Sequence, residues 1–358
     1  MRIINEIYDK TVANEELIYL NNSTCLLDIE TTGFSRDVNH IYMIGLARLE
    51  NDKVKISLLF ADKRTEEKDI LYEFMNYSKD IKRFITFNGI SFDFPFIKKR
   101  MIHYNMDYDY LQYEHLDIYK ECKKLKELLC LSNLKQKTFE AFLGIEREDI
   151  YSGGELISQY KSYEKCKDEE CLKNLITHNL EDVKGMVDLL IILRYLHITD
   201  NLKNSSIENI TNNENEITAT IKTEYEIPKR FVIKSTFYYI IFENNLIKII
   251  LKPFCGTLKY YLKDYKNYIY LLNEDIIIPK QLLNENNKKN AVPVKKDNCY
   301  VEADGLFLPV YDSTLFEEEK LYKEDLTSKE SFINISSKMC DAIYLHKYII
   351  HIIKYRLN

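Results

Sequence analysis

The stretch CLLDIETTGF at residues 25–34 places two carboxylates inside an apolar run. The leucines and isoleucine around them indicate a buried strand, in which residues two apart point to the same face. Asp28 and Glu30 therefore project together, with Cα atoms about 6.6 Å apart. Burying unpaired carboxylates is costly, and each raises the pKa of the other. Either a divalent cation holds the pair, or this edge of the strand faces solvent.

A third acid stands in TFNGISFDFPFIKKR, residues 86–100. Asp93 lies among phenylalanines, after an expected strand and just before an expected helix that begins near Pro95, a residue suited to a first turn. An acid in this aromatic setting needs a partner. The alternative is that Asp93 is simply the N-cap of that helix.

A histidine and a fourth acid stand in THNLEDVKG, residues 177–185. His178 and Asp182 are four residues apart on an expected long helix, so they share one face. A carboxylate there can bind a metal, and an imidazole with a pKa near 6.5 suits removal of a proton from a metal-bound water. The alternative is an ordinary His–Asp pair on a solvated face.

The order of expected elements favours an α/β or α+β plan, with strands first and helices covering them. Strands are expected at 24–30, 40–50, 53–62, 83–89 and 115–119, a helix at 65–78, and mainly helix from about 120 to 196. Residues 200–216 are rich in Asn, Glu and Ser, which predicts a linker or exposed loop. Beyond them, Tyr- and Ile-rich runs predict antiparallel strands, and the tail from Ser331 to Leu357 predicts one helix.

We therefore expect an N-terminal extension at 1–21, a first domain at 22–199, a linker at 200–216 and an appended β-rich region with a C-terminal helix at 217–358.

Composition limits the classes of function. The formal net charge is −6 over 358 residues, so any nucleic-acid contact must use local basic patches or bound metal ions. The eight cysteines are scattered without a C-x-x-C pair, which favours free thiols in a reducing cytosol. We find no apolar run of signal-peptide or membrane-span length, so we expect a soluble cytoplasmic protein with no membrane partner.

Taken together, the three motifs resemble those of the DEDD-type 3′–5′ exonucleases of the ribonuclease H-like superfamily. DIETTG resembles the first motif, FNGISFDFPF the second and HNLEDV the third. The bacterial YprB-like group of ribonuclease H-like domains is the most similar, and the resemblance covers roughly residues 22–196. It implies a mixed five-stranded sheet flanked by helices, and a metal-dependent 3′–5′ exonuclease acting on single-stranded DNA or RNA.

The resemblance also implies roles for particular residues. Two divalent ions, Mg²⁺ or Mn²⁺, would be bound by four acids: Asp28, Glu30, Asp93 and Asp182. His178 occupies the position of the proton acceptor. Four further residues match substrate-contacting positions: Thr31, Thr32, Asn88 and Phe92.

One departure concerns the proton acceptor. The family has either a Tyr four residues before the last acid or a His five residues before it, whereas His178 is four residues before Asp182. The spacing therefore leaves open whether the imidazole of His178 can contact the attacking water. Two alternatives stay beside the exonuclease: a structure-specific endonuclease using the same site, and a nucleic-acid-binding module without turnover.

Overall fold

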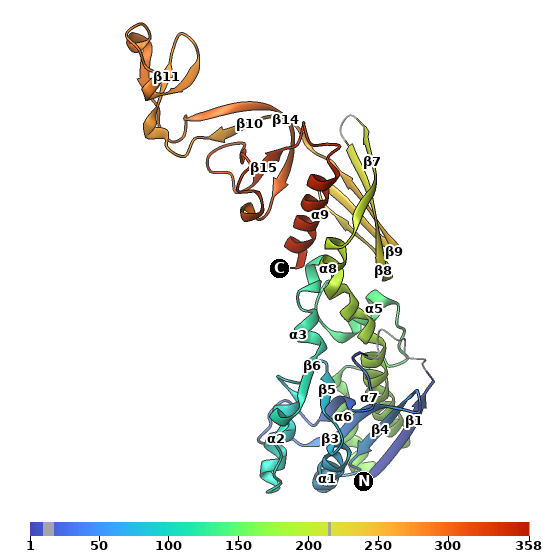
Figure 1. Ribbon diagram of the computed structural model, residues 1–358. Coiled ribbons are helices and arrows are strands. Elements are labelled where there is room, and N and C mark those ends of the chain that lie inside the picture. Colours follow the sequence, from blue (N-terminus) through green and yellow to red (C-terminus); the bar gives the residue numbers. More distant parts are fainter. Residues whose placement is uncertain (10–17, 214–215, 358) are drawn as a thin grey trace. The chain divides into compact units, whose positions relative to one another are not determined.

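The computed structural model describes residues 1–9, 18–213 and 216–357 (Figure 1). The chain divides into two compact units, Met1–His197 and Ile198–Asn358. Within the described residues, no helix is both long and apolar enough to cross a membrane.

The first unit is built on a mixed sheet covered by helices. Its strands are β1 (Arg2–Tyr8), β2 (Thr24–Thr31), β3 (Ile41–Glu50), β4 (Lys53–Phe60), β5 (Arg83–Thr86) and β6 (Glu114–Asp117). Its helices are α1 (Glu67–Ser78), α2 (Asp93–His103), α3 (Ile118–Cys122), α4 (Leu125–Leu128), α5 (Gln136–Leu143), α6 (Gly153–Cys166) and α7 (Glu169–Leu189), followed by a 3₁₀ segment at Leu190–His197.

The strand order is β1-β4-β3-β2-β5-β6. The first four strands of this order pair antiparallel, whereas β5 is parallel to both β2 and β6. The mixed α/β plan expected from the sequence is confirmed, with six strands instead of five.

The sixth strand, β1, comes from the expected N-terminal extension. It pairs antiparallel with β4 from Arg2↔Phe60 to Tyr8↔Val54, which satisfies backbone groups that an uncovered sheet edge would leave unpaired. The expectation that residues 1–21 lie outside the domain is therefore wrong over 2–8. The part of that extension at 10–17 lies outside the described residues.

The two faces of β2 carry different side chains, apolar on one face and acidic on the other. Cys25, Leu27 and Ile29 point into a core shared with apolar residues of α1 and α2. Asp28 and Glu30 alternate with them and therefore face the other side, where α7 contacts β2 and β3. The period of two in β2 thus separates a packed core from a row of acids.

The second unit is β-rich and ends in a helix, as expected. Its elements are α8 (Ile198–Lys203), β7 (Ser206–Asn213), β8 (Glu216–Lys234), β9 (Tyr238–Leu251), β10 (Phe254–Tyr261), β11 (Tyr268–Leu271), β12 (Ile276–Pro279), β13 (Ala291–Pro293), β14 (Tyr300–Val310), β15 (Ser331–Asn334) and α9 (Ala342–Leu357). The strands form sheets of order β7-β8-β9, β10-β14-β15 and β12-β11-β13. The long hairpin of β8 and β9 is prominent in Figure 1.

Two local expectations in this unit are wrong. Residues 200–216 were expected to be a linker or loop, but they contain the end of α8 and strand β7, because the polar strand pairs along its length with β8. The tail is not one helix from Ser331, because Ser331–Asn334 pairs with β14 and α9 begins only at Ala342.

Candidate metal and nucleic-acid site

Asp28 and Glu30 reach a cavity because α7 approaches β2 and β3 closely. Gly45 on β3 is the register partner of Asp28. A Cβ at Gly45 would lie 2.2 Å from Oδ1 of Asn179 and 2.6 Å from Cγ2 of Val183, so only glycine leaves room for the helix. Asn179 is fully buried there, and its Nδ2 donates to Oδ2 of Asp28 at 2.6 Å. The sequence does not predict a role for Asn179, although it directly follows His178.

Asp93 joins the site through the edge of β2. The pairing of β5 with β2 ends at Leu26↔Ile85, which leaves the next part of that edge without a strand neighbour. Oδ1 of Asp93 accepts the backbone N–H of Ile29 at 3.0 Å and fills the gap. Asp93 is the first residue of α2, and the N-cap position belongs to Phe92. The alternative of Asp93 as the N-cap therefore fails.

His178 and Asp182 project from α7 toward Glu30. Nε2 of His178 lies 3.2 Å from Oδ2 of Asp182 and 3.4 Å from Oε1 of Glu30. His178 is only 6% exposed, so this is not a pair on a solvated helix face. One ligand atom from each of these three residues lies within 4.8 Å of the other two. Asp28 and Asp93 line the same cavity outside this tightest group.

A loop between α5 and α6 supports both α7 side chains. Arg147 bonds Oδ1 of Asp182 and also pairs with Glu140 at 3.1 Å. Two residues later, Oδ2 of Asp149 lies 2.8 Å from Nδ1 of His178. The sequence does not predict roles for Arg147 and Asp149. Because they lie in an irregular loop with no periodic pattern, only the tertiary contact reveals them.

Three acids of the cavity have raised pKa values, because nearby positive charge does not fully compensate them. Burial raises the pKa of Asp28 and of Glu30 well above the ordinary values, and repulsion from Asp182 and Asp93 raises both further. Burial raises the pKa of Asp93 to about 7, although the backbone N–H groups of Ile29 and Asp93 itself oppose the shift. A divalent cation in the cavity would offset this repulsion and favour the ionised carboxylates.

The cavity has a volume of about 350 Å³ and an aromatic rim. Ten residues line it: Asp28, Ile29, Glu30, Phe34, Phe87, Asn88, Phe92, Asp93, His178 and Asp182. None of these is lysine or arginine. Hard divalent cations such as Mg²⁺ prefer oxygen ligands, and this set offers four carboxylates and one imidazole. The residues present therefore fit a divalent ion.

Two of the predicted substrate-contacting residues line this cavity. Asn88 has a left-handed backbone, with φ of 68°, and Asp117 holds the turn by accepting N–H bonds from Asn88 at 2.8 Å and Ile90 at 3.2 Å. Phe92 meets Phe34 edge-on, with ring centroids 6.3 Å apart. Phe34 is 84% exposed, and the sequence does not predict a role for it.

The other two, Thr31 and Thr32, do not line it. The hydroxyl of Thr31 donates to the carbonyl of Gly33 at 2.9 Å. The hydroxyl of Thr32 accepts the N–H of His40 at 2.9 Å. Both side chains are buried and shape the loop after β2, so their contact with substrate stays a prediction.

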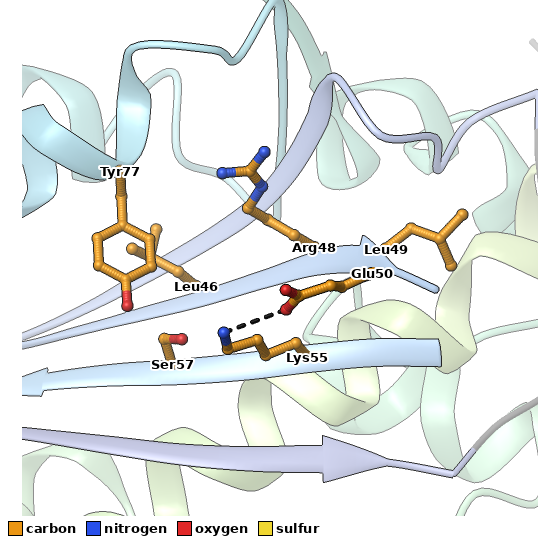
Figure 2. A pocket seen from close by; sticks show the side chains of 7 residues that line it. All are labelled: Leu46, Arg48, Leu49, Glu50, Lys55, Ser57 and Tyr77. Atoms are coloured by element: carbon orange, nitrogen blue, oxygen red, sulfur yellow. Dashed lines mark ion pairs between the residues drawn. The ribbon is translucent and has the colours of Figure 1, made fainter. Parts of the chain in front are cut away.

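A second hollow, of about 190 Å³, is lined by residues of β3, β4 and α1 (Figure 2). Its charged residues include Lys55 and Glu50, which form an ion pair at 3.1 Å. Leu46 belongs to the core that α1 and α2 cover, so this hollow is on the face of the sheet away from α7. Nothing in its lining resembles the acid cluster.

The similarity to a known protein family lies in the first unit, which contains the acid cavity. A family model described as the RNase_H superfamily matches residues 25–194. The uncharacterized protein YprB of Bacillus subtilis (strain 168) is 25% identical in an alignment over 197 residues that covers 52% of this chain and 45% of that relative. Residues 25–194 form a ribonuclease H-like domain.

Among solved structures, the family B DNA polymerase from the hyperthermophilic archaeon Pyrobaculum calidifontis is similar with a TM-score of 0.40. Its sequence identity is 10%, with 72% of this chain and 39% of the polymerase chain covered. The present chain spans less than half the length of YprB.

The family match covers all ten residues that line the cavity. Asp28 and Glu30 lie on β2, Asp93 lies on α2, and His178 and Asp182 lie on α7.

Proposed function

We propose that this chain is a metal-dependent 3′–5′ exonuclease that hydrolyses phosphodiester bonds of single-stranded nucleic acid by a two-metal mechanism. The observation that carries the proposal is the convergence of Asp28, Glu30, Asp93 and Asp182 on one cavity. The raised pKa values of the first three carboxyls add to it. A cluster of this kind has a physical reason to exist only if cations or protons compensate it.

The four acids would hold two divalent ions, Mg²⁺ or Mn²⁺. When bound, such ions polarise a phosphate oxygen and lower the pKa of water. Side chains of the protein orient the acids and accept the proton. Asn179 orients Asp28 through a 2.6 Å hydrogen bond. Arg147 engages Oδ1 of Asp182. His178 turns Nε2 toward the cavity, where it would accept the proton of the attacking water.

The substrate and the direction of cleavage rest on two supports. Phe34 and Phe92 offer aromatic faces at the rim, and stacking on such rings suits unpaired bases. Asn88, Thr31 and Thr32 are proposed to contact the terminal nucleotide. The 3′–5′ direction follows from the resemblance of the three motifs to the DEDD exonucleases. The eight free cysteines fit a proposed cytoplasmic location.

The direct test is a cleavage assay on single-stranded DNA and RNA, labelled at either the 3′ or the 5′ end, with Mg²⁺ or Mn²⁺. We expect a ladder that shortens from the 3′ end, is lost with EDTA, and is lost in Asp182→Asn. The matched control is Glu170→Gln, an exposed acid on the same helix, which should cleave like the wild type.

Other outcomes would redirect the proposal. Cuts within a circular single strand would favour the endonuclease. Binding of the strands without cleavage in either metal would reject catalysis and favour a binding module.

A further inference from the structure

Asp149 is a buried acid that the proposed chemistry has not used. Its side chain is 1% exposed. Oδ2 lies 2.8 Å from Nδ1 of His178 and accepts from Nζ of Lys137 at 2.9 Å. Oδ1 accepts the backbone N–H of Tyr151 at 3.0 Å. Both carboxylate oxygens are therefore committed to fixed partners, and one of these is the imidazole of the site.

The loop that carries Asp149 is attached to α7 at several points. Oε1 of Glu181 accepts the N–H of Glu148 at 2.9 Å, and Oε2 accepts that of Asp149 at 2.8 Å. Arg147 contacts Asp182, and Asp149, two residues later in the loop, contacts His178. Asp182 and His178 are one turn apart on α7. The position of Asp149 relative to His178 is therefore set by backbone contacts as well as by the side-chain bond.

The contact with Asp149 selects one form of the neutral imidazole. An ionised carboxylate can only accept, so Nδ1 of His178 must carry the proton and donate it. In the neutral ring Nε2 then presents its lone pair toward Oε1 of Glu30 and Oδ2 of Asp182, a contact that is favourable when these carboxyls are protonated or bound to a cation. The opposite tautomer would turn an N–H toward the place where a proton acceptor is needed.

We propose that Asp149 is a positioning residue that holds His178 in the Nδ1–H tautomer, with the Nε2 lone pair directed into the acid cavity. The inference rests on the proposed nuclease function for its kinetic consequence. The tautomer itself is a property of the protein without substrate.

The tautomer is measurable on the full chain by nitrogen NMR with ¹⁵N-labelled histidine, at a pH where imidazole is neutral. The His178 signals are assigned by their loss in His178→Ala. We expect the Nδ1–H form in the wild type and a shift toward the Nε2–H form in Asp149→Asn. An Nε2–H form in the wild type, or an unchanged tautomer in Asp149→Asn, would overturn the proposal.

The kinetic test is a double-mutant cycle. We expect Asp149→Asn to lower kcat about 10- to 100-fold with an unchanged KM, since a positioned base contributes roughly 10²- to 10⁴-fold. In the His178→Ala background the same change should cost nothing further, because Asp149 acts through that ring. Glu146→Gln, an exposed acid in the same loop, is the charge-matched control and should be neutral.

The readouts separate the two hypotheses. An equal loss of kcat in both backgrounds would mean that Asp149 only supports the fold, and would overturn the inference. If the wild type cleaves no nucleic acid, the proposed function fails, whereas the tautomer measurement still decides the part played by Asp149.

Discussion

The ribonuclease H-like domain and the second unit both bury ionisable groups, but they treat them in opposite ways. In the second unit, His351 is 1% exposed and its Nε2 accepts the backbone N–H of Tyr311 at 3.0 Å. Its ring packs against Phe316, with centroids 5.1 Å apart. Burial lowers the pKa of His351 to about 4, with only partial opposition from Asp312. This histidine is neutral, enclosed and bonded to backbone.

The acids of the first unit instead face one another across an open cavity. The pKa values of Asp28 and Glu30 are raised by burial and by mutual repulsion, and Arg147, which pairs with Asp182 behind the cavity, offsets this only partly at Asp28. Burial of an ionisable side chain alone therefore does not indicate a functional role. A buried acid that opens to a cavity and is repelled by like neighbours would be stabilised by a bound cation, whereas His351, enclosed by aromatic rings and bonded to backbone through Nε2, serves the fold.

The largest expected effect concerns the acid cavity. Glu30→Gln should reduce metal-dependent cleavage at least about 10³-fold, roughly 4 kcal/mol in the barrier, because a metal ligand is lost. The same change should leave the metal-free domain as stable or more stable, since it removes one of the mutually repelling charges. The measurements are kcat and the unfolding temperature in EDTA.

The corresponding change in the second unit is His351→Phe, which should destabilise that unit and leave kcat unchanged. If His351→Phe lost activity and Glu30→Gln lost stability, His351 would be functional and Glu30 structural, which would contradict this comparison.

A further effect is an opposite pH dependence of the stability of the two units. Asp93 has a folded pKa of about 7 against an ordinary 3.8, so the folded state binds more protons between these values. The metal-free first unit should therefore lose stability as the pH rises through this range. His351 has a folded pKa of about 4 against 6.5, so the unfolded state binds more protons there. The second unit should lose stability as the pH falls from 6.5 to 4.

Hydrogen exchange of α7 and of α9, corrected for intrinsic exchange rates and measured in EDTA, reports the two units separately. We expect protection of α7 to weaken at higher pH and protection of α9 to weaken at lower pH. His351→Phe should abolish only the second trend. Parallel trends in both helices would show that the two sets of buried groups do not differ as described.

The same two units differ in how far the sequence predicts them. In β2, alternation with a period of two and two acids in an apolar run indicate both the strand and its functional face, and the structure has this strand at Thr24–Thr31. Asp93 and the His178–Asp182 pair could be found because each stands next to a recognisable element boundary or helical repeat. Local pattern is sufficient for these residues.

Other parts depend on contacts distant in sequence. Nothing local to Asp149 shows that it meets His178, 29 residues later. The hydroxyls of Thr31 and Thr32 turn into their own loop because Gly33 and His40 offer backbone partners. In the second unit, the polar composition of 206–213 indicates a loop, yet pairing with β8 makes it a strand. Strand pairing is a tertiary interaction that composition does not encode.

The central claim is that the acid cavity is a metal centre, and calorimetric titration of Mn²⁺ into the substrate-free protein tests it most directly. We predict saturable binding of two ions per chain with release of protons, because the buried carboxyls with raised pKa values must give up protons to bind metal. Glu30→Gln should weaken this binding, and Glu170→Gln should not. Heats in the wild type that are no larger than those of Glu30→Gln, without proton release, would contradict the account.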